Sequence, residues 1–112
     1  MLPKNQRLNL KTDFKWVASG KRLESKFLKL FFKMGENQTP RAGIAVSSKI
    51  FSKATDRNRA RRLIAQAFQS IVGQLPSTIN IVALPKAGVL GVKSSDVLSD
   101  LANALKNERI IP

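Results

Sequence analysis

Two residue types on which many active sites depend are missing, because the 112-residue sequence contains no cysteine and no histidine. Without cysteine, the chain cannot form a disulfide, a zinc–thiolate site or a cysteine nucleophile. Without histidine, it lacks the commonest general base and the commonest metal ligand of enzymes. The sequence therefore excludes much of the side-chain chemistry that catalytic and metal sites use.

Long apolar runs are missing as well. The longest, such as "LFF" and "IVAL", are far too short to span a bilayer. The opening "MLPKNQRLNLK" has no apolar stretch long enough for a signal peptide, and no basic amphipathic anchor with a clean apolar face is found. We expect a soluble, cytoplasmic protein that has no membrane partner.

Acidic residues are few, with 7 Asp and Glu against 20 Lys and Arg, which gives a net charge of +13. Such an excess of cations is typical of proteins that bind nucleic acid. Hydrophobic residues make up 43% of the chain, so its composition does not favour disorder. A chain of this length can bury a hydrophobic core that needs no disulfide or metal to stabilise it. We expect a single RNA-binding domain over residues 1–112.

Hydrophobic patterning predicts an α+β fold with the order α-β-β-β-α-β-α, a two-layer sandwich of helices on a four-stranded sheet. Thr12 is a suitable N-cap for the first helix, and Gly20 suits a left-handed residue at its end. Residues 79–85 are apolar on both faces, which indicates a central strand. The expected helices are 11–21, 57–73 and 95–107, and the expected strands are 26–34, 41–48, a short one within 49–56, and 79–85.

The stretch "ATDRNRARRLIAQAF" (54–68) places four arginines within six residues. On a helical wheel for 57–73, apolar side chains gather on one side and a polar strip lies opposite. Arg57 and Arg61 fall on one border of the apolar side. The apolar side holds Ala60, Leu63, Ile64, Ala67, Phe68 and Ile71, and the polar strip holds Asn58, Arg59, Arg62, Gln66 and Gln69.

The start of a helix is an unfavourable place for cations, because it carries a partial positive charge that costs about 0.3–1 kcal/mol for each one. Asp56 offsets only part of this cost, and no acidic residue follows between Arg57 and Ser95. Unpaired arginines beside free backbone N–H groups favour an anion, and planar guanidinium groups suit phosphates. A solvated charged face would normally mix signs, so we interpret this strip as a phosphate-binding surface.

Other candidate sites have simpler explanations. Asp96 and Asp100 could hold a metal, although carboxylates in the first turns of a helix also complement its dipole. Ser47 and Lys49 could be taken for a nucleophile pair, but no oxyanion hole or general base accompanies them. The G-x-x-G at 88–91 is the kind of loop that clamps RNA in KH domains, yet its apolar middle favours a plain turn.

Two aromatic residues, Phe14 and Trp16, lie among lysines in the expected first helix. Aromatic rings between lysines suit stacking on unpaired bases. A place in the hydrophobic core is the alternative for both.

The segment "KATDRNRARR" (53–62) resembles the signature of the protein subunit of bacterial ribonuclease P, which is Arg-Asn-Arg followed by x-[Arg/Lys]-Arg in a helix. The opening "RLNLKTDFKWVASGKR" resembles the first helix of that family, with Phe14 at its aromatic position. "RAGIAVSSK" and "INIVALPK" resemble two of its strands. The resemblance thus extends over nearly the whole chain.

This resemblance implies a fold shared with domains of a small-subunit ribosomal protein and of elongation factor G, including a rare left-handed β-α-β crossover. It also implies that the protein, as a monomer within the ribonucleoprotein, binds a large catalytic RNA. That RNA removes the 5′ leader of precursor tRNA with Mg²⁺ that it holds mainly itself. The protein would contribute no catalytic side chain and would bind no metal alone.

Two surfaces follow from the resemblance. The catalytic RNA would contact the motif residues Arg57, Asn58, Arg59, Arg61 and Arg62. A cleft between the first helix, the sheet and the motif helix would receive the single-stranded leader. Phe14, Lys15, Trp16, Ser47, Lys49 and Lys53 would line this cleft or lie beside it.

The sequence departs from the family pattern near the expected cleft. Ser48 stands in a usually basic pair, Ala18 replaces a second aromatic, and "IFSKATD" is one residue longer than in common versions. Two alternatives remain: a free-standing KH-like or ribosome-associated RNA-binding module, and a metal-dependent nuclease that acts alone through Asp96 and Asp100.

Overall fold

The computed structural model describes residues 2–112 and confirms the predicted order of helices and strands. The elements are α1 (Leu10–Ala18), β1 (Lys21–Glu24), β2 (Leu28–Met34), β3 (Arg41–Ile44), α2 (Ala54–Ile71), β4 (Ile79–Pro85) and α3 (Ser94–Asn107), with 3₁₀ turns at Lys4–Gln6, Val72–Gln74 and Ala87–Gly91. Within this described part, no helix combines the length and the apolar character that a membrane crossing needs.

The four strands form one mixed sheet in the order β1-β2-β4-β3. β2 pairs antiparallel with β1 and β4, whereas β3 pairs parallel with β4. α2 therefore connects two parallel neighbours, and this connection is the crossover whose left-handedness stays a prediction. β4 lies inside the sheet with Ile79–Ala83 buried, as its apolar faces predicted.

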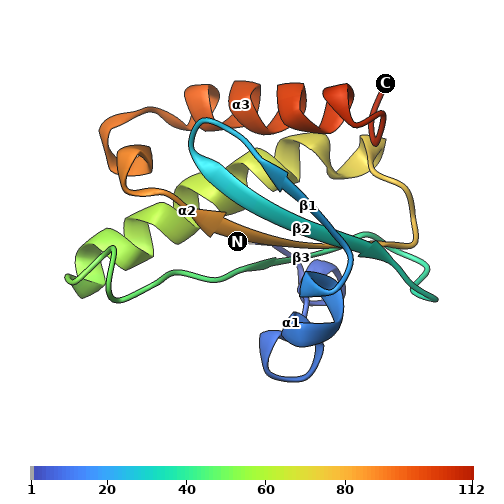
Figure 1. Ribbon diagram of the computed structural model, residues 1–112. Helices are drawn as coiled ribbons and strands as arrows, with labels where there is room; N and C mark the ends of the chain where they lie inside the picture. The colour runs from blue at the N-terminus through green and yellow to red at the C-terminus, as the bar shows by residue number, and fades with distance from the viewer. Residues whose placement is uncertain (1) are drawn as a thin grey trace.

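The side chains of β2 alternate between two differently covered faces of the sheet. Leu30 and Phe32 enter the main core with side chains of α2 and α3, while Phe31 packs into a smaller cluster with Val17 of α1. Figure 1 shows α2 and α3 on one side of the sheet and α1 on the other. Because α1 has only nine residues, it covers part of its face and leaves the rest accessible.

One of the four strands is wrongly placed by the sequence prediction. Residues 48–50 form a turn, and no strand occurs within 49–56. The fourth strand is instead β1, which the sequence did not predict. It consists of three exposed residues and the half-buried Leu23. An edge strand with a single apolar residue has no alternation to detect, and its pairing with β2 decides its structure.

The ends of α1 also differ from the prediction. Asn9, not Thr12, caps the helix, because its Oδ1 accepts the N–H of Lys11 at 3.1 Å. None of the glycines has a positive φ, so Gly20 does not form a left-handed end. A Cβ at Gly20 would instead lie 2.3 Å from the carbonyl oxygen of Phe32. Glycine is required there because the chain passes directly against β2.

The two aspartates of α3 have hydrogen-bonding roles that account for them. Asp96 Oδ2 accepts the backbone N–H of Lys93 at 3.0 Å, at the start of the helix. Asp100 accepts the hydroxyl of Ser25 at 2.6 Å and the N–H groups of Lys26 and Phe27 at 3.0 and 2.9 Å. Asp100 thus joins the β1–β2 turn to α3, a role that its sequence position did not indicate.

Asp100→Asn is expected to lower the free energy of unfolding by about 1–3 kcal/mol, because three donors lose a charged acceptor. Chemical denaturation measures this loss. Asp96→Asn is the matched control, since it affects one exposed hydrogen bond on the same helix. Equal stability of the two variants would contradict the anchoring role of Asp100.

Candidate nucleic-acid interface

α2 has the two faces that the helical wheel predicted. Its apolar side packs into the core, where Ala60, Ile64, Ala65, Ala67, Phe68 and Ile71 are buried. Arg59 and Arg62 are exposed on the opposite side, and Arg57 and Arg61 are half-buried at the border. The amphipathic spacing of this segment therefore directs two arginines fully into solvent.

The four arginines differ in what they bind within the protein. Arg57 Nη1 donates to the carbonyl oxygens of Phe51 and Ser52 at 2.8 and 3.1 Å, so it ties the preceding loop to the helix. Arg61 Nη1 donates to Asn58 Oδ1 at 3.1 Å. Arg59 and Arg62 make no hydrogen bond or ion pair with any residue in the range 2–112. These two guanidinium groups keep all their donors available for a ligand.

α2 begins three residues earlier than predicted, at Ala54, which changes the electrostatic argument. Arg59 and Arg62 now lie beyond the first turn, where the helix dipole is weak. The chain accepts these cations because they are placed further along the helix than the sequence suggested. The N-cap is Lys53, and no side chain caps the first N–H groups. An anion at this end would meet both the N–H groups and a lysine.

A second surface lies on the sheet face that α1 partly covers. Phe14, Phe31, Ala45 and Leu84 are partly buried and pack over a small core of Leu8, Val17 and Val82. We call the four partly buried residues the apolar strip. They come from α1, β2, the end of β3, and β4, so only the folded sheet brings them together. Their exposed surface can receive flat apolar groups, including bases.

Phe31 and Leu84 belong to this strip but were not among the residues predicted to bind the leader. Because Leu30 and Phe32 face the main core, the alternation of β2 must send Phe31, with Lys29 and Lys33, to the other face. That alternation was the available signal. On the same face, Glu24 Oε1 lies 2.8 Å from Lys86 Nζ.

That ion pair affects the charge of the sheet face. The hydrogen bond and the charge of Lys86 hold the pKa of Glu24 below its ordinary value. The pair carries no net charge, so the positive charge of this face comes from its other lysines, Lys29 and Lys33.

The six residues predicted for the leader do not all meet. Phe14 lies in the apolar strip, while Trp16 and Lys15 are exposed elsewhere on α1. Ser47 and Lys49 lie on the segment that runs from β3 to the start of α2 (Figure 1), and Lys53 is the N-cap of α2. Ser47 Oγ accepts the N–H of Lys49 at 3.1 Å, which shapes this segment.

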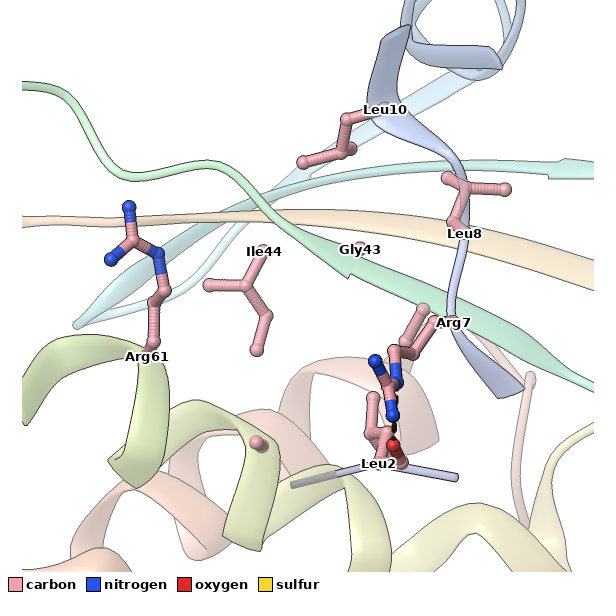
Figure 2. A pocket seen from close by; sticks show the side chains of 9 residues that line it. Leu2, Arg7, Leu8, Leu10, Gly43, Ile44 and Arg61 are labelled. Carbon is pink, nitrogen blue, oxygen red and sulfur yellow. Dashed lines mark hydrogen bonds between the residues drawn. The ribbon is translucent and has the colours of Figure 1, made fainter. Parts of the chain in front are cut away.

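A pocket of about 140 Å³ lies between the N-terminal segment, β3 and α2. Figure 2 shows Arg61 of α2 and Arg7 of the N-terminal segment on either side of Ile44. Leu8 and Leu10 line the pocket and also belong to the cluster of the apolar strip. The pocket thus lies between Arg61, at the border of the arginine face of α2, and Leu8 and Leu10, at the edge of the cluster that the apolar strip covers.

The sequence is similar to those of known proteins over most of its length. The family profile described as Ribonuclease P matches residues 2–109. A ribonuclease P protein component from Pseudanabaena sp. is 35% identical over 109 residues, which cover 96% of this chain and 90% of the relative. One from Nitrosococcus oceani is 36% identical over 90 residues, which cover 77% and 72%. This chain belongs to the ribonuclease P protein family.

The fold agrees with a solved member of the ribonuclease P protein family. The ribonuclease P protein from Thermotoga maritima matches with a TM-score of 0.80 at 30% identity, over 90% of this chain and 96% of that one. The resemblance carried by "KATDRNRARR" is therefore confirmed. Family membership replaces the alternative of a free-standing KH-like module.

The structure shows where Ala18, one departure from the ribonuclease P family pattern, lies. Ala18 follows Phe14 by four residues on α1, so the two share a helix face. Where the family usually has a second aromatic residue, this chain has a small half-buried one. Phe31 of β2 supplies another aromatic ring to the same cluster.

Proposed function

We propose that this chain is the protein subunit of ribonuclease P. Its α2 face binds the catalytic RNA through Arg59, Arg62, Asn58 and Arg61, while Arg57 positions the loop before the helix. The apolar strip and the basic segment 47–53 hold the single-stranded 5′ leader of precursor tRNA. The RNA then hydrolyses the bond at the mature 5′ end.

One observation carries this proposal: the domain combines arginines without protein partners on α2, Arg59 and Arg62, with a strip that holds two aromatic rings. A pocket between them is lined by Arg61 of α2 and by Leu8 and Leu10 of the cluster under the strip. Unpaired guanidinium groups suit the phosphates of a folded RNA. Aromatic rings in basic surroundings suit unpaired bases. A protein that held only a duplex would have no use for these partly exposed rings, so the pair of surfaces supports a structured RNA and a single strand together.

In this proposal the protein supplies binding and the RNA supplies catalysis. The cleavage requires Mg²⁺, which the RNA of the holoenzyme mainly holds, because phosphate oxygens suit that ion. The carboxylates of Asp96 and Asp100 already accept hydrogen bonds from the protein's own backbone. Their geometry favours structural roles over a catalytic metal centre.

Purified protein alone is expected to leave precursor tRNA intact at every Mg²⁺ concentration, whereas the protein with catalytic RNA cleaves it. Gel analysis of the 5′ leader product measures both. Asp96→Asn should keep the reconstituted activity nearly unchanged, and it is chosen because Asp100→Asn also weakens the fold. Cleavage by the protein alone, lost in Asp96→Asn, would instead support a metal-dependent nuclease.

A further inference from the structure

Trp16 is an exposed aromatic residue that the apolar strip leaves unexplained. Its relative exposure is 41%, and it follows Phe14 by two residues, so the two rings leave α1 on different sides. Trp16 takes no part in the cluster around Val17 that Phe14 joins. A tryptophan that is this exposed loses the stabilisation that burial provides. Its contacts indicate what the ring does at the surface.

Those surroundings hold the ring and its helix in place. Lys33 Nζ lies over the indole, 5.2 Å from the ring centroid, and donates to Ser19 Oγ at 3.0 Å. Ser19 Oγ in turn donates to the carbonyl oxygen of Trp16 at 2.6 Å. The ring, the lysine and the end of α1 thus form one connected unit.

The loop after β2 lies against the edge of the ring. A Cβ at Gly35 would lie 2.9 Å from Trp16 Cη2 and 2.9 Å from Asn80 Nδ2, so only glycine lets the loop approach both. Asn80 is 3% exposed and donates to Asn37 Oδ1 at 2.8 Å. Asn37 donates to the carbonyl oxygen of Thr39 at 2.7 Å. Hydrogen bonds between Asn37, the buried Asn80 and the backbone therefore hold this loop against the exposed indole.

We propose that Trp16 and Lys33 form a stacking site for one unpaired RNA base, separate from the apolar strip. The base would stack on the indole surface that Lys33 leaves free, and the ammonium group would approach the adjoining phosphate. This combination of a fixed ring and a cation suits any base without reading its sequence. The inference rests on the proposed function only in taking RNA as the ligand.

The chain provides its own probe for this site. Trp16 is the only tryptophan and no tyrosine is present, so the indole fluorescence reports this position alone. Titration with a short oligoadenylate should quench that fluorescence at the same concentrations at which the anisotropy of a labelled oligonucleotide rises. Saturated binding without any change in fluorescence would overturn the proposal.

Variants separate a binding role from a structural one. Trp16→Ala should weaken oligoadenylate binding on the order of tenfold, as the loss of one stacked ring predicts. Lys33→Gln should lower the slope of log K against log salt by about 1. Met34→Ala is the matched control. Met34 is 48% exposed and follows Lys33 on β2, so its side chain lies on the opposite face of the sheet. An affinity loss in Met34→Ala equal to that of Trp16→Ala, or unchanged affinity in Trp16→Ala, contradicts the site.

The source of the base is found with the assembled ribonucleoprotein. Quenching on assembly with the catalytic RNA assigns the base to that RNA. Quenching only after a precursor with a long leader is added, and not after mature tRNA, assigns it to the leader. Active enzyme with no quenching in either arm overturns this site alone, whereas an assembly that binds RNA but never cleaves overturns the proposed function.

Discussion

The double variant Arg59→Ala, Arg62→Ala is expected to bind the catalytic RNA roughly 100-fold more weakly than the unmodified protein. Each guanidinium contributes about 1.5 kcal/mol when it bonds a phosphate, at the low end for bonds to charged groups, and two such losses amount to about two decades in affinity. The slope of log K against log salt should fall by about 2. Filter binding over a salt series measures both quantities.

The stability of the double variant should stay within about 0.5 kcal/mol of the original, because both side chains are exposed and make no contact that folding needs. Its matched control is Lys106→Ala with Arg109→Gly, which removes two exposed cations at the far end of α3 (Figure 1). Arg109 has a φ of 59°, a conformation that glycine adopts without strain. The arginines would not bind phosphates directly if the double variant unfolded. The same would follow if the control variant lowered the slope of log K against log salt as much as the double variant does.

Phe14→Ala is expected to weaken the binding of precursor tRNA to the assembled enzyme by about 5- to 150-fold, the effect of losing one stacked base. Binding of mature tRNA should not change, because it has no leader to place on the apolar strip. The decisive series uses precursors of decreasing leader length. The penalty should disappear once the leader is too short to reach Phe14.

Since Phe14 is partly buried beside Val17, a control must separate stacking from packing. Phe14→Leu keeps most of the apolar contact and loses the ring, so it should retain the thermal stability but share the weaker binding. Lys49→Ala should reduce precursor binding more mildly, and its effect should shrink as salt rises. A penalty that is independent of leader length, or one that follows thermal stability across the Phe14 variants, would assign Phe14 to the core alone.

Much of the fold could be predicted because its signals are local. The amphipathic spacing of α2 correctly placed Ala60 and Phe68 in the core and Arg59 and Arg62 in solvent. The continuous apolar run of 79–85 correctly indicated a central strand. β1 could not be found this way, because an edge strand with one apolar residue owes its structure to the strand beside it.

The predicted site was less complete than the predicted fold. The motif arginines are local, but Arg57 proves to hold the carbonyl oxygens of the preceding loop, which no helical wheel reveals. Phe31 and Leu84 join Phe14 only because three separate elements meet on one face of the sheet. Trp16, close to Phe14 in sequence, lies outside that cluster because residues two apart on a helix face different ways.

By itself, the sequence determined the basic character of the protein, the two faces of its arginine helix and the family motif, since each depends on residue types at short, regular spacings. Tertiary structure alone decided which residues share a surface. Asp100 meets a turn 73 to 75 residues earlier in the chain. The loop at Gly35 meets both Trp16 and Asn80, which hydrogen-bonds Asn37 of the same loop. Such contacts depend on how the sheet and helices pack together, and the identity of neighbouring residues in the chain carries no record of that packing.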